Sequence, residues 1–284
     1  MSTPLRARLR RLAMGLATVT GIAPRGWFIP YRYRGSTPEG GSLPVYGALE
    51  ARFRAAEPMF QQAIAGMESH WPSLAALSNT KPPAPRFEQM WFPGLDGAFA
   101  YGLIRDHRPS RLVEVGSGHS TRFFARAVAD GGLGTRITAI DPAPRADIAG
   151  LAGVEVIHAT VQAAGEAPFA TLGPGDVLAI DSSHILMPGS DVDMLFNRIL
   201  PGLPAGVLVQ IHDILLPDDY PPAWSWRGYN EQQALGPLLR SGAELLWSSH
   251  YVRSRMADRL ARGPLSGLPL KPGAMETALW LKLS

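Results

Sequence analysis

Cysteine is absent from all 284 positions of the chain. Its absence excludes disulfide bonds, thiolate catalysis and zinc sites built on cysteine. Hydrophobic residues make up 46% of the sequence, which at this length is enough for one sizeable core. We therefore expect a domain held together by its core rather than by cross-links. The lack of cysteine also agrees with a cytoplasmic location, which we expect.

Long hydrophobic runs, internal repeats and heptad patterns are missing as well. The apolar stretch at residues 12–23 is too short to span a bilayer. It follows four arginines and superficially resembles a secretory leader, but no convincing cleavage site precedes the aromatic phrase that starts at Gly26. We expect residues 1–26 to form a basic amphipathic or flexible segment, with peripheral attachment to an anionic membrane and export as alternatives. The arginines are Arg6, Arg8, Arg10 and Arg11.

Concentrated positive charge is missing from the rest of the chain. The net charge is only +3, and the basic residues, mostly arginine, are spread along the sequence. A nucleic-acid-binding face needs clustered contacts to phosphates. The charge pattern therefore argues against nucleic acid as a partner.

Four apolar stretches each end at polar or acidic residues. Such stretches are typical of buried parallel strands in an α/β protein. The carboxyl ends of these strands meet at one edge of the sheet, where α/β proteins bind their ligands. The stretches are residues 111–115, 136–140, 177–180 and 207–211, and the polar residues at their ends are Glu114, Asp141, Asp181, and His212 with Asp213.

The first stretch runs into a glycine turn, Gly116-Ser117-Gly118, which is followed by a helix-like segment. Glycine lets the backbone approach a ligand closely, and the free N–H groups at a helix start attract polar or anionic groups. Ser120 or Thr121 is a suitable N-cap for this helix. The turn therefore predicts a site for a nucleotide-sized ligand.

Asp141 ends the second stretch, 27 residues after Glu114. This spacing is somewhat longer than the roughly 20 residues expected for an acid that binds a ribose in a dinucleotide fold. A carboxylate at this position is nevertheless suited to a ribose diol, because it can accept two hydrogen bonds at once. We expect Asp141 to bind a ribose.

Seven short phrases follow one another in an order typical of one protein family. They are Glu-Val-Gly-Ser-Gly-His-Ser-Thr at 114–121, Ile-Asp-Pro at 140–142, Asp-Ser-Ser-His at 181–184, Gly-Ser-Asp-Val at 189–192, His-Asp-Ile at 212–214, Asp-Tyr-Pro at 219–221 and Asn-Glu-Gln at 230–232. With these phrases, roughly residues 27 to 250 resemble a class I S-adenosylmethionine (SAM)-dependent methyltransferase, in a bacterial branch acting on small molecules or glycans. The resemblance implies a Rossmann-like, seven-stranded, mostly parallel α/β sheet of order 3-2-1-4-5-7-6, flanked by helices.

The resemblance also implies a domain plan and a SAM site. Residues 27–95 are expected to form an N-terminal lid, and residues 96–284 the SAM-binding domain. Gln162 falls where the family contacts adenine, and the glycine turn falls where it holds the methionine part of SAM. The full set expected to bind SAM is Glu114, Gly116, Ser117, Gly118, Ser120, Thr121, Asp141, Gln162 and Asp181.

The acceptor side of the site has two interpretations. In metal-dependent O-methyltransferases, residues at the positions of Asp181, His212 and Asp213 hold a divalent ion that lowers the pKa of the acceptor hydroxyl. This chain has a histidine where such enzymes often carry an acid or amide, and a mixed set of imidazole and carboxylate ligands tolerates Mn, Fe or Zn more readily than Mg. In the second interpretation no metal takes part: His212 or His184 is the catalytic base and Asp213 orients the ring.

Several polar and aromatic residues near these phrases have less specific explanations. Trp91 and Phe92 are expected in the core. Asp191 follows Ser190 at a helix start, where a negative side chain interacts favourably with the helix dipole, so we expect a structural role for it. Asn230 or Glu231 either caps the next helix or recognises the acceptor.

We therefore expect a methyltransferase that uses SAM, and a divalent metal in one interpretation, to methylate a small-molecule or glycan-precursor acceptor at oxygen. One alternative is a metal-dependent oxygenase or hydroxylase on the same fold, with Asp181, His184 and His212 as the ligands. Another is a SAM-binding protein without catalytic activity. The sequence identifies neither the acceptor nor the oligomeric state.

Overall fold

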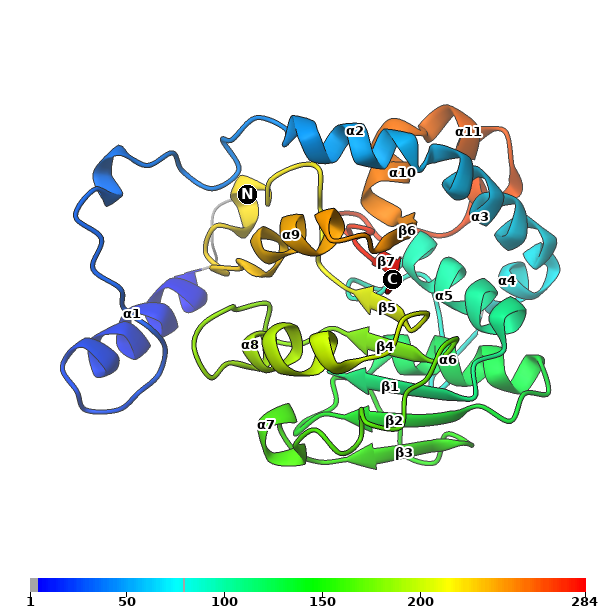
Figure 1. Ribbon diagram of the computed structural model, residues 1–284, viewed down its shortest axis with the longest axis horizontal. Coiled ribbons are helices and arrows are strands. Elements are labelled where there is room, and N and C mark those ends of the chain that lie inside the picture. Colours follow the sequence, from blue (N-terminus) through cyan, green and yellow to red (C-terminus); the bar gives the residue numbers. More distant parts are fainter. Residues whose placement is uncertain (1–4, 79) are drawn as a thin grey trace. The chain divides into compact units, whose positions relative to one another are not determined.

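The computed structural model describes residues 5–78 and 80–284 and contains a seven-stranded sheet of order β3-β2-β1-β4-β5-β7-β6 (Figure 1). The neighbours from β3 to β5 pair in parallel, and β7 is antiparallel to both β5 and β6. The expected fold class and strand order are confirmed. The strands are β1 (Arg111–Val115), β2 (Arg136–Ile140), β3 (Val154–Ile157), β4 (Val177–Ile180), β5 (Leu208–Ile211), β6 (Glu244–Ser248) and β7 (Leu279–Lys282).

The central strands β4 and β5 are almost entirely apolar, as strands buried on both faces must be. Every residue of β4 and β5 is buried, and both strands consist of apolar residues except for Gln210. Strands covered on both faces need this continuous apolar character. Their carboxyl ends then carry the polar residues that follow, Asp181 after β4 and His212 after β5, to the same edge of the sheet.

Helical segments of very different lengths lie before and between the strands along the chain. The segment that starts at Asp191 continues from an α-helix into a π-helix and then a 3-10 helix. The α-helices are α1 (Leu5–Val19), α2 (Gly47–Ala55), α3 (Glu57–Ser69), α4 (Trp71–Leu77), α5 (Gly94–His107), α6 (His119–Asp130), α7 (Val161–Ala164), α8 (Asp191–Met194), α9 (Leu235–Arg240), α10 (Ser249–Arg255) and α11 (Ala257–Ala261); the other helical turns are η1 (Arg34–Ser36), η2 (Leu195–Ile199), η3 (Leu200–Gly202), η4 (Pro222–Trp224), η5 (Glu231–Ala234) and η6 (Pro264–Gly267).

Helices α5 and α6 pack closely against each other (Figure 1). A Cβ atom on Gly97 of α5 would lie 2.5 Å from the ring of Phe123 of α6, so only glycine permits this approach. The contact fixes the start of α6, which follows the glycine turn. It also fixes the start of α5, where Asp96 is fully buried.

The chain forms two compact units. One contains the described part of Met1–Val45 together with Asp218–Tyr229, and the other contains Tyr46–Pro217 and Asn230–Ser284. The expected boundary at residues 95 and 96 differs from this division: α3 buries Phe60, Ile64 and Met67 and contacts β6, so the helices after residue 45 belong to the sheet unit. Residues 1–4 of the expected N-terminal segment lie outside the described residues.

Candidate functional site

The glycine turn after β1 passes directly against the end of β4. Gly116 has a φ of +79°, and a Cβ atom there would lie 1.8 Å from the carbonyl oxygen of Asp181. Both the positive φ and the close approach require glycine. The turn therefore holds the ends of β1 and β4 together and leaves its N–H groups at the edge of the sheet.

The first turn of α6 differs from the expectation. The helix begins at His119, and the residue that precedes it is Gly118, so the proposal that Ser120 or Thr121 is the N-cap was wrong. Both hydroxyls instead donate hydrogen bonds of 2.5 Å to the buried carboxylate of Glu114. The Thr121 hydroxyl also accepts a hydrogen bond from the Gly118 N–H at 2.9 Å. Glu114 thus ties the helix start to β1, because both oxygens of its carboxyl group accept hydrogen bonds from these hydroxyls.

Glu114 is only 1% exposed. Burial raises the pKa of its carboxyl to about 8, although the hydrogen bonds from Ser120 and Thr121 oppose this rise. A carboxyl with this pKa carries a proton at neutral pH. The residue therefore supports the turn from behind as a largely neutral group.

Asp141 organises the neighbouring turn. Its carboxylate accepts a hydrogen bond from the Ser117 N–H at 2.7 Å and one from the Ala143 N–H at 2.7 Å. One carboxylate thus connects the glycine turn with the segment that follows β2. Each of its oxygens keeps lone-pair capacity for a further donor.

A cavity of about 400 Å³ opens between these turns. This volume lies in the range of small-molecule and cofactor sites. Its wall comes from the segments that follow β1, β2, β3 and β4. Six of the residues expected to bind SAM line it: Gly116, Ser117, Ser120, Asp141, Gln162 and Asp181. The other three are not among the described residues that line the cavity. They are Glu114, Gly118 and Thr121, and their mutual hydrogen bonds support the cavity wall from behind.

One wall of the cavity is aromatic. The indole of Trp91 stacks on the imidazole of His119, with ring centroids 5.1 Å apart and planes 7° apart, and the guanidinium of Arg145 lies over the same indole. Burial and nearby arginines lower the pKa of His119 to about 4, so the stacked ring is neutral at physiological pH. Phe92 is buried as expected, whereas Trp91 is 41% exposed and was wrongly expected in the core.

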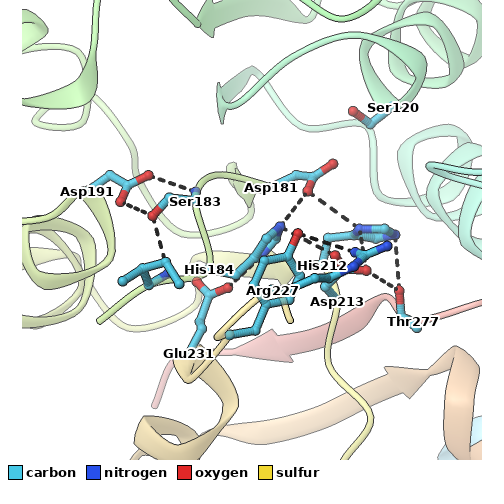
Figure 2. A network of polar contacts seen from close by, with 12 residues as sticks. Ser120, Asp181, Ser183, His184, Asp191, His212, Asp213, Arg227, Glu231 and Thr277 are labelled. Atoms are coloured by element: carbon cyan, nitrogen blue, oxygen red, sulfur yellow. Dashed lines mark hydrogen bonds and ion pairs between the residues drawn. The ribbon is translucent and has the colours of Figure 1, made fainter. Parts of the chain in front are cut away.

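A second group of polar side chains gathers at the ends of β4 and β5. Figure 2 shows the carboxylate of Asp181 between two imidazoles: its Oδ1 lies 3.3 Å from His184 Nε2 and 3.5 Å from His212 Nδ1. Asp213 contacts the same two ring nitrogens, at 3.5 Å and 3.6 Å. The structure thus brings together all four residues expected on the acceptor side. We call Asp181, His184, His212 and Asp213 the His–Asp cluster.

The outer ring nitrogen of each histidine is held by a further buried carboxylate. His184 Nδ1 lies 2.8 Å from Glu231, and His212 Nε2 lies 3.2 Å from Asp96. Asp96 also accepts hydrogen bonds from the N–H groups of Thr277 and Ala278. These carboxylates fix the orientation of both rings. The roles of Asp96 and Thr277 were missed, because nothing local in the sequence connects positions so far apart.

The backbone of the His–Asp cluster is strained at two positions. His184 and Asp213 have positive φ angles, of 61° and 55°, and neither is glycine. This conformation is costly for a residue with a Cβ atom and is found most often at functional sites. In this conformation His184 contacts both Asp181 and Asp213.

The charges of the His–Asp cluster depend on one another. Burial alone would lower the pKa of both imidazoles, but the carboxylates of Asp181 and Glu231 around His184, and of Asp181, Asp96 and Asp213 around His212, raise it well above the ordinary value. Burial would raise the pKa of Asp181, but the two imidazoles hold it well below its usual range. Asp181 is therefore an anion between two cationic rings.

The two aspartates of the His–Asp cluster are more exposed to solvent than its two histidines. The side chains of Asp181 and Asp213 are 26% and 13% exposed, whereas both imidazoles are almost completely buried. Among the described residues, Asp181 is the member that lines the cavity. The two histidines therefore stand behind Asp181 rather than in the cavity wall.

Two further polar residues have structural contacts. Asp191 lies at the start of α8, as expected, and accepts hydrogen bonds from the N–H and hydroxyl of Ser183, while the Ser190 side chain caps the helix. Asn230 forms two hydrogen bonds with the backbone of Leu186. These bonds hold the loop between β4 and α8 in place, so that His184 is oriented from both ends.

Comparisons with known proteins give one family match and several similar solved structures. Residues 113–214 match the family model described as a methyltransferase domain, and no curated protein matches the chain. The solved structures similar to it include SAH-bound PaMTH1, a methyltransferase of Podospora anserina, with 15% identity over 91% of this chain and 99% of that chain and a TM-score of 0.40. An O-methyltransferase from Bacillus cereus in complex with SAH has 13% identity, coverages of 78% and 91% and a TM-score of 0.41. A structure of CmcI with Mg and SAM has 12% identity, coverages of 76% and 84% and a TM-score of 0.41.

The family match begins inside β1 and ends just after the His-Asp pair that follows β5, so it spans the glycine turn, Asp141 and the His–Asp cluster. The strand order of the sheet is the one that the family resemblance implies. Over residues 113–214 the chain therefore matches the model described as a methyltransferase domain, and this stretch contains the glycine turn, Asp141 and the His–Asp cluster.

Proposed function

We propose that this protein transfers the methyl group of SAM to a hydroxyl oxygen of a small-molecule or glycan-precursor acceptor. One observation carries the proposal: Asp181 belongs both to the wall of the cavity and to the His–Asp cluster. A donor bound in the cavity and an acceptor activated by the cluster would therefore meet at this carboxylate. Positioning of donor and acceptor supplies much of the rate enhancement of such a transfer.

The cavity wall offers a complementary group for each part of SAM. The backbone of Gly116 and Ser117 is suited to the methionine part, Asp141 to the ribose hydroxyls and Gln162 to the adenine. The flat indole of Trp91 provides further apolar surface. Asp181 stays ionised because its pKa is lowered, and an anion at this place attracts the positive sulfonium group.

The reaction requires a place for one proton. The acceptor oxygen forms a bond to the methyl carbon, the carbon–sulfur bond breaks with its electron pair going to sulfur, and the hydroxyl proton must leave. We propose that Asp181 and Asp213 accept the hydrogen bond from the acceptor hydroxyl, and that an imidazole behind them in its neutral form takes up the proton. Because the pKa of His212 is raised, its neutral form is a strong base but a minor species at neutral pH, so turnover should increase with pH.

A divalent metal is the other expected means of activation. The chemistry of the donors fits a cation, since two carboxylates and two imidazoles face one another and each ring is oriented by an outer carboxylate. As placed, however, the described residues include no group of three or more His, Asp or Glu side chains that could hold a metal ion. We derive the reaction from the proton-transfer route, because its carboxylates and imidazoles already lie within 3.6 Å of one another.

Methyl transfer can be tested by measuring SAH production from SAM with pools of phenols and sugar nucleotides. We expect turnover with a hydroxyl acceptor, a loss of about 10²–10⁴-fold in His212→Gln, and SAM affinity within about threefold of the wild type in that variant. His70→Gln is the matched control, because His70 pairs with Asp106 away from the cavity. Full activity of His212→Gln would remove this residue from the mechanism.

The same assay separates the remaining alternatives. SAM binding without turnover on any pool would favour a non-catalytic SAM-binding protein, and iron-dependent oxygen uptake would favour an oxygenase. Loss of activity after chelation, with recovery on adding Mn or Mg, would show that a metal takes part. Unchanged activity after chelation is expected for the proton-transfer route.

A further inference from the structure

Helix α1 exposes a stripe of large apolar residues. Their side chains are between 56% and 72% exposed, and the spacing of four and three residues places all five on one face of the helix. A helix that belongs to a folded unit normally turns such a stripe inward. We call Leu5, Leu9, Leu12, Leu16 and Val19 the leucine stripe.

The opposite side of α1 is the side that contacts its own unit. Met14 and Thr18 are half-buried, and both border a hollow shared with Trp27 and Phe28. The Thr18 hydroxyl accepts a hydrogen bond from the Arg25 N–H at 3.0 Å. At 3.6 residues per turn, Met14 lies half a turn away from the leucine stripe. The unit thus contacts the face of α1 that carries Met14 and Thr18, and the leucine stripe on the other face is exposed.

Every charged residue in the first 38 positions of the sequence is positive. The first 38 residues contain seven arginines and no lysine, aspartate or glutamate, which leaves 20 basic against 24 acidic residues in the rest of the chain. Arg6 and Arg8 flank the stripe on its two sides. Trp27, Phe28 and Tyr31 follow on the same unit and are more than half exposed. Aromatic residues of this kind are typical of membrane–water interfaces.

We propose that α1 docks this unit on an anionic phospholipid surface, with the leucine stripe among the acyl chains and the arginines at the phosphates. No helix of the described residues is long and apolar enough to cross a membrane, so the helix would lie in the plane of the interface. The proposal is independent of the methyl-transfer reaction.

Other occupants fit the leucine stripe less well. A second copy of α1 would bring two sets of arginines together without any acidic partner, whereas paired helices need opposite charges beside their seam. A nucleic acid would bind the arginines but would leave the leucines exposed. An anionic bilayer is the partner that uses both features.

Vesicle flotation of the full chain tests the proposal. We expect binding to phosphatidylcholine vesicles that contain about one-third phosphatidylglycerol, weak binding to pure phosphatidylcholine, and release at high salt. Leu12→Glu with Leu16→Glu, and separately Arg6→Glu with Arg8→Glu, should each lower the partition coefficient at least about tenfold. The matched controls are Leu270→Glu and Arg240→Glu, which change exposed residues elsewhere and should bind like the wild type.

Each other outcome would overturn the proposal. Failure to bind anionic vesicles, or equal binding to neutral ones, would exclude an anionic membrane. Loss of binding in the arginine variant but not in the leucine variant would indicate a general attraction to polyanions without use of the stripe. A wild-type dimer that becomes a monomer in the leucine variant, measured by light scattering, would assign the stripe to a second copy. Unchanged melting temperatures and SAM affinities in the variants serve as the check on folding.

Discussion

Two acidic side chains near the ends of neighbouring strands differ in protonation: Asp181 is ionised and Glu114 is largely neutral at pH 7. Asp181 follows β4 and lies between two imidazoles, which lower its pKa. Glu114 sits in β1 and has only hydroxyl donors in direct contact, so burial dominates and raises its pKa to about 8. At the scale of single residues, the partner rather than the position in the strand decides the charge.

The first prediction concerns the pH dependence of stability. The pKa of Glu114 is higher in the folded chain, about 8, than the ordinary 4.5, so the folded chain keeps a proton that the unfolded chain releases between these values. Its contribution to the free energy of unfolding is therefore fully present below about pH 4.5 and decreases as the pH rises to about 8. Glu114→Gln lacks this titration. Urea unfolding from pH 5 to 8.5 should show the wild type losing a few kcal/mol, on the order of 4, relative to the variant. Parallel curves would contradict it.

The second prediction concerns Asp141. Asp141→Ala removes the acceptor for the Ser117 and Ala143 N–H groups and the proposed ribose contact, so SAM affinity should fall by about 1.5–3 kcal/mol. Asp147→Ala is the control, because Asp147 likewise accepts a hydrogen bond from a nearby N–H, that of Ala149, but lies outside the described residues that line the cavity. Titration calorimetry measures both. Equal affinities of the two variants would remove Asp141 from the site.

At the scale of elements, the central strands could be predicted because their signals are local, whereas the order of the sheet was expected from the family resemblance. Each central strand is apolar and stops at a polar residue. The start of α6 was predicted less well. A serine and a threonine near a helix start suggest capping, but the buried Glu114 competes for both hydroxyls, and this competition depends on packing that the sequence does not display.

The outer carboxylates of the His–Asp cluster illustrate the same limit. Asp96 lies in α5 and reaches His212 across 116 positions of the sequence. Glu231 reaches His184 across 47 positions, and local reasoning left its role open between capping and acceptor recognition. The four members of the cluster could be predicted because they follow strands. Their supporting residues could not, because only the packing of α5 and η5 near the strand ends brings them there.

The third prediction uses two glycines with the same backbone angle. Gly116 and Gly150 both have a φ of +79°, but a Cβ atom at Gly150 meets nothing within 4 Å, whereas one at Gly116 overlaps the Asp181 carbonyl. Gly150→Ala should cost only about 1–2 kcal/mol of stability for its conformation. Gly116→Ala should cost about 1–3 kcal/mol more and should also weaken SAM binding, because the turn must move. Thermal unfolding and calorimetry compare the two. Equal losses would mean that the turn is less constrained than its geometry indicates.

At the scale of the whole molecule, the two compact units differ in what they carry. Every described residue that lines the 400 Å³ cavity, and every member of the His–Asp cluster, belongs to the unit formed by Tyr46–Pro217 and Asn230–Ser284. The leucine stripe and all seven arginines of the first 38 residues belong to the other part of the chain. The proposed cofactor site and the proposed membrane contact thus lie in separate units, so each can be tested without changing the other.

The last prediction follows from this division. A ligand stabilises the structure that binds it and leaves independent parts unchanged, since its binding energy is added only where it makes contacts. Saturating SAH should therefore slow amide hydrogen exchange in residues 114–121, 141–145, 160–162 and 181–184, which line or support the cavity, and leave residues 5–28 unchanged. Mass spectrometry of peptides from the full chain measures this, and Asp141→Ala at the same SAH concentration should show reduced protection. Slower exchange in residues 5–28 to the same degree would show that the N-terminal unit takes part in binding the cofactor, and protection confined to residues far from the cavity would place SAH elsewhere.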